Sequence, residues 1–264
     1  APGEMVPMLK EDHPDLLKQD PYVGTVFLRF NTEVEPLNNP KVRAALSLAI
    51  DRQRLTENLI YGHRPASGIT PPFGDYKTPK GVSFDPKRAA QLLDEAGFTD
   101  RSSFPSIKIL TASRESSRTI CEAVQAMWKK HLGITVSIEN REWSSYISSV
   151  QNKDYHISFG GWIGDYLDPT TFLYMWQKDD GNNNTGWSSE KFAELLDAAA
   201  AQADPQARLS TLAEAESVLL NDHPIAPISW YARNYLLHPS VKGWSPLLLD
   251  NHPYKDIRLE SVED

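Results

Sequence analysis

Acidic and aromatic side chains gather around glycines in segment 160–168, whose sequence is GGWIGDYLD. Asp165 lies between Trp162 and Tyr166. A carboxylate beside aromatic rings suits an ammonium group, because the rings supply apolar contact and lower the local dielectric. The residues alone leave a structural alternative open, in which Asp165 caps a turn and Trp162 packs in the core. The segment therefore predicts a recognition loop for a cationic ligand or an ordinary turn.

Two elements must position this loop. Apolar and polar residues alternate over 154–159, which predicts a half-buried strand ending at the glycines. Asp168 precedes Pro169 after the loop. The carboxylate can cap free N–H groups and proline suits the first helical position, so a helix is expected to begin there. Asp168 thus has a structural role that Asp165 lacks.

The rest of the chain mixes strand and helix patterns without a fixed repeat, which indicates an α/β protein. Strand 107–111, helix 114–132 and strand 134–139 form a β-α-β unit, so we expect parallel pairing with a right-handed crossover. Segment 61–82 is rich in proline and glycine and predicts a long loop, over either the ligand site or plain surface. Further elements are expected at strand 23–31, at helices beginning after Asn39, Asp51 and Asp85, and at a helical hairpin over 192–220.

Composition excludes several classes of function. The net charge of -8 and the absence of basic runs argue against a nucleic-acid partner. Cys121 is the only cysteine, so no intrachain disulfide forms, and we expect a buried, inert thiol. The seven histidines are dispersed, and no hydrolase, phosphate-loop or zinc motif occurs, so neither a metal nor a cofactor is expected. No apolar run approaches the roughly 20 residues of a membrane span, and no signal peptide is present, as in a mature exported protein or an internal fragment.

Five blocks, taken in order, resemble the C-terminal lobe of the bacterial solute-binding proteins that serve peptide ABC transporters, the oligopeptide- and dipeptide-binding family 5. The blocks are 37–52 (LNNPKVRAALSLAIDR), 70–72 (TPP), 83–89 (SFDPKRA), segment 160–168, here called the tryptophan loop, and 225–230 (IAPISW).

The resemblance implies a periplasmic-binding-protein-like lobe with a mixed, largely parallel central sheet flanked by helices. It implies that residues 1–21 are a linker or inter-lobe entry, 22–237 the C-terminal ligand-binding lobe, and 238–264 a return segment toward an N-terminal lobe. Full-length members are about twice as long and close two lobes on the ligand. An isolated lobe is therefore expected to bind weakly, because it covers one side of the ligand only.

The resemblance also implies ligand contacts. The acid at the position of Asp165 grips the α-ammonium of a peptide, and the tryptophan at the position of Trp162 lies against the ligand, with Tyr166 beside it. Asn184 and Trp187 are further candidates, because a similar asparagine-rich loop lies by the pocket in relatives. A plain helix-entry turn is the alternative for 181–187. Some relatives hold the peptide carboxylate with an arginine where this chain has Phe159.

The expected function is capture of a short peptide or other amine-bearing solute for an ABC importer, by a monomer that docks on a membrane permease. The expected location is periplasmic or extracellular, with membrane anchoring through a preceding part as an open possibility. No enzymatic activity is expected. Two alternatives remain: a free-standing protein-interaction lobe without a transport role, and a hydrolase that uses Asp165 and Asp168 as an acid and base pair.

Overall fold

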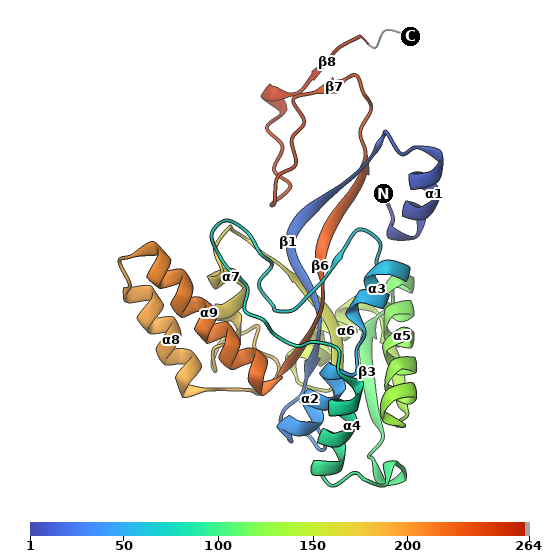
Figure 1. Cartoon of the computed structure of the whole chain (residues 1–264), viewed down its shortest axis with the longest axis vertical. Helices are drawn as coiled ribbons and strands as arrows, with labels where there is room; N and C mark the ends of the chain where they lie inside the picture. The colour runs from blue at the N-terminus through green and yellow to red at the C-terminus, as the bar shows by residue number, and fades with distance from the viewer. Residues whose placement is uncertain (262–264) are drawn as a thin grey trace.

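A mixed six-stranded sheet forms the centre of the computed structural model, which describes residues 1–261, and helices cover both of its faces (Figure 1). The strand order is β2-β6-β1-β5-β3-β4. The strands are β1 (Leu17–Phe30), β2 (Arg64–Pro65), β3 (Ile107–Ala112), β4 (Val136–Arg141), β5 (Ile157–Ile163) and β6 (Ile225–Leu236), with β7 (Val241–Lys242) and β8 (Arg258–Leu259) in a separate two-stranded sheet. The α-helices are α1 (Val6–Asp12), α2 (Pro40–Leu48), α3 (Arg52–Asn58), α4 (Pro86–Glu95), α5 (Glu115–Leu132), α6 (Trp143–Gln151), α7 (Thr170–Leu173), α8 (Glu190–Ala201) and α9 (Pro205–Asp222). Short 3-10 helices lie at Gly3–Met5, Arg101–Ser103, Tyr174–Trp176 and Tyr254–Asp256.

The α/β class and the mixed sheet are confirmed, but the expected predominance of parallel strands is wrong. The β3-α5-β4 unit is parallel as predicted, and β3 also pairs in parallel with β5. The pairs β1–β5, β1–β6 and β2–β6 are antiparallel. The reason is that β1 and β6, the two longest strands, run in opposite directions through the middle of the sheet.

Helix starts follow the side-chain caps expected from the sequence. Asn39, Asp51 and Asp85 each accept a hydrogen bond from a backbone N–H in the first turn of α2, α3 and α4. These bonds satisfy donors that the helix itself leaves free. Gly133 ends α5 at a φ of 73°, the left-handed region that glycine adopts without steric cost.

Alternate residues of β1 contribute to two separate cores. Val26, Leu28 and Phe30 pack under α2, α4 and α5, and Cys121 is fully buried among them. Burial raises the pKa of this thiol to about 12, which agrees with the inert thiol expected from the sequence. Phe27, on the opposite face of β1, packs with α7, α8 and α9. The sheet is therefore covered on both sides, and its exposed edges and loops are the places left for ligands.

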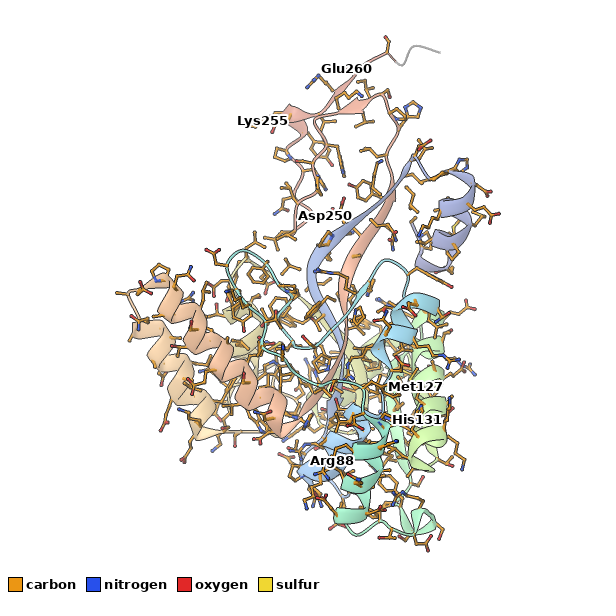
Figure 2. The ribbon with its side chains drawn as sticks, viewed as in Figure 1. Arg88, Met127, His131, Asp250, Lys255 and Glu260 are labelled. Carbon is orange, nitrogen blue, oxygen red and sulfur yellow. The ribbon has the colours of Figure 1, made fainter. Side chains whose placement is uncertain are left out.

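The two chain ends extend beyond the main sheet. Residues 1–21 contain α1 and the start of β1, and their assignment as a linker or inter-lobe entry stays a prediction. The segment Leu17–Pro21 pairs with the end of β6, and the two strands rise together toward the β7–β8 hairpin (Figure 1). Figure 2 labels Asp250, Lys255 and Glu260 in this upper part, far from the helices α4 and α5. The assignment of 238–264 as a return segment stays a prediction.

The proline- and glycine-rich loop 61–82 is fixed by one buried carboxylate. Glu216 on α9 is fully buried and accepts hydrogen bonds from the backbone N–H of Thr70 at 3.0 Å and from the hydroxyl of Tyr76 at 2.5 Å. Burial raises the pKa of Glu216. The loop also meets the sheet directly, because Thr25 donates to the carbonyl of Ile69. This loop is thus a packed part of the lobe.

Within residues 1–261, no helix has both the length and the apolar character that crossing a membrane requires.

Substitution of Glu216 tests this packing. We expect Glu216→Ala to lower the free energy of unfolding by about 1 to 3 kcal/mol for each of the two buried donors it leaves unpaired. Glu216→Gln keeps one acceptor oxygen, replaces the other with an NH2 donor and carries no charge. Because the folded pKa of Glu216 is raised, wild-type stability declines as pH rises from 4.5 through that pKa, and the Gln variant should lack this decline. Urea unfolding across that pH range measures both effects, and an Ala variant as stable as wild type would refute the role of Glu216.

Candidate ligand-binding site

The tryptophan loop leaves the end of β5, next to the central strand β1. In the antiparallel register Trp162 lies opposite Thr25, and Ile163 lies opposite Gly24. The expected strand 154–159 is displaced: β5 begins at Ile157 and continues through Ile163. Gly160 and Gly161 therefore lie within the strand. Close packing explains one of them, since a Cβ on Gly161 would lie 2.6 Å from the hydroxyl of Tyr231.

Trp162 combines packing with a polar group that has no partner. Its ring is partly buried and packs against the second core, to which α7 contributes Phe172 and Leu173. Its Nε1 is buried and makes no hydrogen bond within residues 1–261. A buried indole N–H normally has an acceptor.

Asp165 presents a free carboxylate at the surface. Its backbone N–H donates to the Thr171 hydroxyl at 3.1 Å, which fixes the turn, but its side chain makes no hydrogen bond or ion pair in the part of the chain that the structure describes. Tyr166 is 45% exposed, and its hydroxyl is 3.3 Å from that of Thr170. The neighbouring Leu167 is 53% exposed. An unpaired acid thus lies among exposed apolar side chains.

Asp168 has the structural role expected for it. It accepts hydrogen bonds from the backbone N–H of Thr170 at 3.0 Å and from its hydroxyl at 2.7 Å, at the start of α7. Arg208 of α9 binds both of its oxygens, at 2.7 and 3.0 Å. Burial opposes ionisation, but the bonds from Arg208 and Thr170 lower the pKa of Asp168 overall. Its carboxylate is therefore already occupied.

Asn184 and Trp187 lie away from this loop. The carbonyl of Asn184 accepts a hydrogen bond from Tyr155, just before β5 begins. Asn184 and Trp162 are thus at opposite ends of β5, about 20 Å apart at about 3.3 Å for each residue. Trp187 is 6% exposed, packs on Phe192 and donates to Asp222 at 3.0 Å. These contacts agree with the helix-entry turn and give no support to either residue as a ligand contact.

Phe159 is also removed from the loop surface. It is 8% exposed and belongs to the first core, on the face of β5 opposite to Trp162. Because strand side chains alternate between faces, Phe159 points away from the side that carries Trp162.

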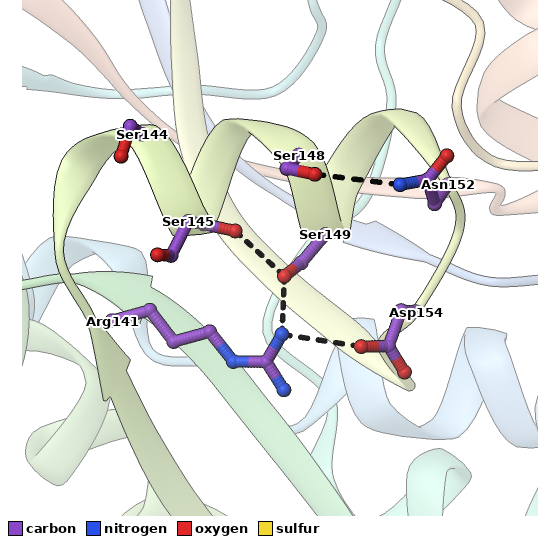
Figure 3. A pocket seen from close by; sticks show the side chains of 7 residues that line it. All are labelled: Arg141, Ser144, Ser145, Ser148, Ser149, Asn152 and Asp154. Carbon is purple, nitrogen blue, oxygen red and sulfur yellow. Dashed lines mark hydrogen bonds and ion pairs between the residues drawn. The ribbon is translucent and has the colours of Figure 1, made fainter.

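A polar pocket of about 390 Å³ lies beside α6 (Figure 3). Its lining residues are Arg141, Ser144, Ser145, Ser148, Ser149, Asn152 and Asp154. Arg141 is paired there with Glu139 and Asp154 and bonds the hydroxyl of Ser149. Protein groups already satisfy the cation, and none of the residues expected in a ligand site lines this pocket.

Arg29 is not among the residues expected from the sequence, although it is buried near the loop. The usable signal is its position in β1, where the other residues of the same face are Val23, Thr25 and Phe27. A charged residue at a buried position, on the same strand face as these uncharged residues, has a specific partner or a function.

Solved structures match this architecture over nearly the whole chain. Escherichia coli MppA, a murein tripeptide binding protein, superimposes with a TM-score of 0.88 at 30% identity and covers 98% of this chain and 52% of its own. Haemophilus influenzae OppA in complex with the peptide RPPGFSPFR gives a TM-score of 0.85 at 27% identity, with 98% and 52% covered. The fold is therefore that of periplasmic binding proteins.

Sequence comparison defines the family. Residues 1–184 match the model of the bacterial extracellular solute-binding proteins, family 5 Middle, and the chain belongs to this family. The oligopeptide-binding protein OppA of Bacillus subtilis is 36% identical over 252 residues, which are 92% of this chain and 46% of OppA. The chain spans about half the length of the relatives it matches.

Asp165 and Asp168 should differ in their effect on stability. Asp168→Asn breaks a bidentate ion pair and should lower the free energy of unfolding at pH 7 by about 1 to 2 kcal/mol. Because the folded pKa of Asp168 is lowered, its stabilisation is present above the unfolded pKa near 3.8 and is lost as pH falls through the folded pKa. Asp165→Asn should leave stability unchanged. Chemical unfolding of both variants measures this, and equal losses would contradict the assignment.

Proposed function

We propose that this chain is one lobe of a receptor that captures short peptides, or other amine-bearing solutes, for an ABC importer. The observation that supports it most is the exposed carboxylate of Asp165, which has no partner within residues 1–261 and lies between Trp162 and Tyr166 in the sequence. The names of the relatives agree, since B. subtilis OppA is an oligopeptide-binding protein and E. coli MppA binds a murein tripeptide.

In this proposal the ligand ammonium pairs with Asp165, while Trp162 and Tyr166 exclude water from one side of the pair. Excluding water matters because an ion pair in bulk solvent contributes little. The exposed side chains of Ile163, Tyr166 and Leu167 offer apolar surface that a second lobe can cover when the ligand is bound. Capture therefore requires closure of two lobes on the ligand.

The same exposed surface is the basis of the second candidate, a free-standing lobe that binds another protein. The hydrolase alternative has less support, because Arg208 and Thr170 already occupy the carboxylate of Asp168. An acid and base pair needs both carboxylates available to substrate and water.

The wider parts of the proposal follow from the family. The receptor acts as a monomer that releases its ligand to a membrane permease, without a cofactor or nucleic acid. Its place is periplasmic or extracellular: the names of several relatives state periplasmic for those proteins, and the name of the family states extracellular.

Removal of the charge on Asp165 should weaken peptide binding. In the full-length protein from its source, Asp165→Asn should reduce the affinity for a tripeptide by about 1.5 to 3 kcal/mol, the scale of a charge-assisted hydrogen bond. Acetylation of the peptide amine should reduce wild-type affinity to a similar degree and have little further effect on the variant. Isothermal titration calorimetry with both peptides completes the cycle.

Asp197→Asn is the matched control, since Asp197 is an exposed acid on the outer side of α8. It should bind both peptides as wild type does. If acetylation weakens wild type and the Asp165 variant equally, Asp165 does not hold the amine.

The mass of the endogenous protein separates the two candidate functions. Intact mass spectrometry should give a chain near twice 29.7 kDa if a second lobe belongs to the same polypeptide. A mass near 29.7 kDa would contradict the two-lobed clamp and favour the interaction lobe.

A further inference from the structure

Three arginines are buried in this lobe, and two of them are fully satisfied by the protein. Arg43 donates to four backbone carbonyls, and Arg52 donates to three carbonyls and a serine hydroxyl. Burial lowers the pKa of both to about 10, so both stay charged at neutral pH. These two show how the fold normally compensates a buried guanidinium.

Arg29 is buried to a similar degree but lacks such partners. It is 8% exposed, and its Nε is buried without a hydrogen bond. The guanidinium lies near the hydroxyl of Tyr146, and its carbon is 4.8 Å from the centre of the Phe27 ring, but no ion pair with an acidic group is found within residues 1–261. Burial of an uncompensated charge is unfavourable, so this position is suited to a site that an anion completes.

The guanidinium lies in a gap in the side chains of β5. Arg29 pairs with Ser158, and Phe27 pairs with Gly160. A Cβ on Gly160 would lie only 2.8 Å from Nη1 of Arg29, so the guanidinium lies over the glycine, and any other residue there would have to displace it. Gly160 is partly exposed, and the next residue on the same face of β5 is Trp162.

The polar groups along this face can all donate a hydrogen bond, and the two hydroxyls can also accept one. The hydroxyl of Ser158 and the Nε1 of Trp162 are both buried and without a partner in the described part of the chain. Tyr146 uses its hydroxyl to donate to the carbonyl of Phe159 at 2.9 Å. Burial raises the pKa of Tyr146, and the positive charge of Arg29 opposes the rise, which agrees with the closeness of the two side chains. A cation with neighbouring unpaired donors calls for an acceptor that carries negative charge.

We propose that Arg29 binds a carboxylate of the ligand, so that this lobe recognises peptides by both charges, the ammonium at Asp165 and a carboxylate at Arg29. This rests on the proposed function. Trp162 lies between the two positions along the chain. Gly160 and Asp165 are five residues apart, at most about 17 Å if extended, which is the length of an extended peptide of about five residues. The carboxylate is the C-terminus of such a short peptide or an acidic side chain within it.

Four peptides separate these sources of the carboxylate. They are penta-alanine, its C-terminal amide, Ala-Ala-Ala-Glu-Ala-amide and Ala-Ala-Ala-Gln-Ala-amide, titrated calorimetrically into the full-length protein. We expect wild type to bind the carboxylate-bearing member of at least one matched pair about ten- to hundred-fold more tightly, the range of a charge-assisted contact. The pair that shows the difference identifies the C-terminus or the side chain.

Variants of Arg29 connect that preference to the residue. Arg29→Gln should bind both members of the pair equally, and Arg29→Lys should keep part of the preference, since it retains the charge but loses the planar fork. Arg118→Gln, an exposed site on α5, is the control and should behave as wild type. A full preference in Arg29→Gln would overturn the inference. Binding that N-acetylation weakens but no carboxylate affects would overturn it and leave the proposed function intact, whereas no binding of any peptide would overturn both.

Thermal unfolding of the ligand-free protein provides a second readout. Replacement of an uncompensated buried charge by an apolar residue of similar size removes an unfavourable term, so Arg29→Met should raise Tm while reducing the rise in Tm that a carboxylate peptide produces. A lower Tm with an unchanged peptide preference would assign Arg29 a purely structural role and contradict the proposal.

Discussion

The antiparallel pairing of β1 with β5 fixes both the core and the candidate site. Its register places Trp162 opposite Thr25 and Arg29 opposite Ser158. Because side chains alternate across a strand, Phe159 is directed into the first core while Trp162 lies on the other face, near Phe27. A slip of one residue would exchange these faces, bury the wrong side chains and remove the guanidinium from Gly160. Stability and recognition therefore depend on the same ladder.

Charged residues in the lobe divide into those the protein compensates and those it leaves available. Asp168 has Arg208 and the start of α7, whereas Asp165, three residues earlier, has no partner for its carboxylate within residues 1–261. Arg52 has four acceptors, whereas the Nε of Arg29 has no acceptor and its guanidinium has no acidic partner within residues 1–261. Asp168 and Asp165 are both aspartates, and Arg52 and Arg29 are both arginines. The difference in compensation therefore depends on the position in the fold and not on the residue type. Unsatisfied charges near a surface loop are expected where a ligand supplies the missing partner.

Local signals in the sequence were sufficient for much of the fold. The caps at Asn39, Asp51 and Asp85 act within one helical turn, and the β3-α5-β4 unit follows from adjacent elements. Contacts between distant segments could not be read in this way. The antiparallel pairing of β1 with β6, and the buried position of Trp187 against Asp222, depend on how α8 and α9 return to the sheet. Arg29 belongs to the same group, since only the register with β5 reveals that Gly160 lies beneath it.

The most direct test of a lobe that recognises both charges of a peptide is a crystal structure of the full-length protein with a bound short peptide. We predict that the ligand amine lies within hydrogen-bonding distance of the Asp165 carboxylate, with the ring of Trp162 against the peptide and a ligand carboxylate on the guanidinium of Arg29. A peptide bound elsewhere, with Asp165 in contact with solvent and Arg29 paired to a protein carboxylate, would contradict the account.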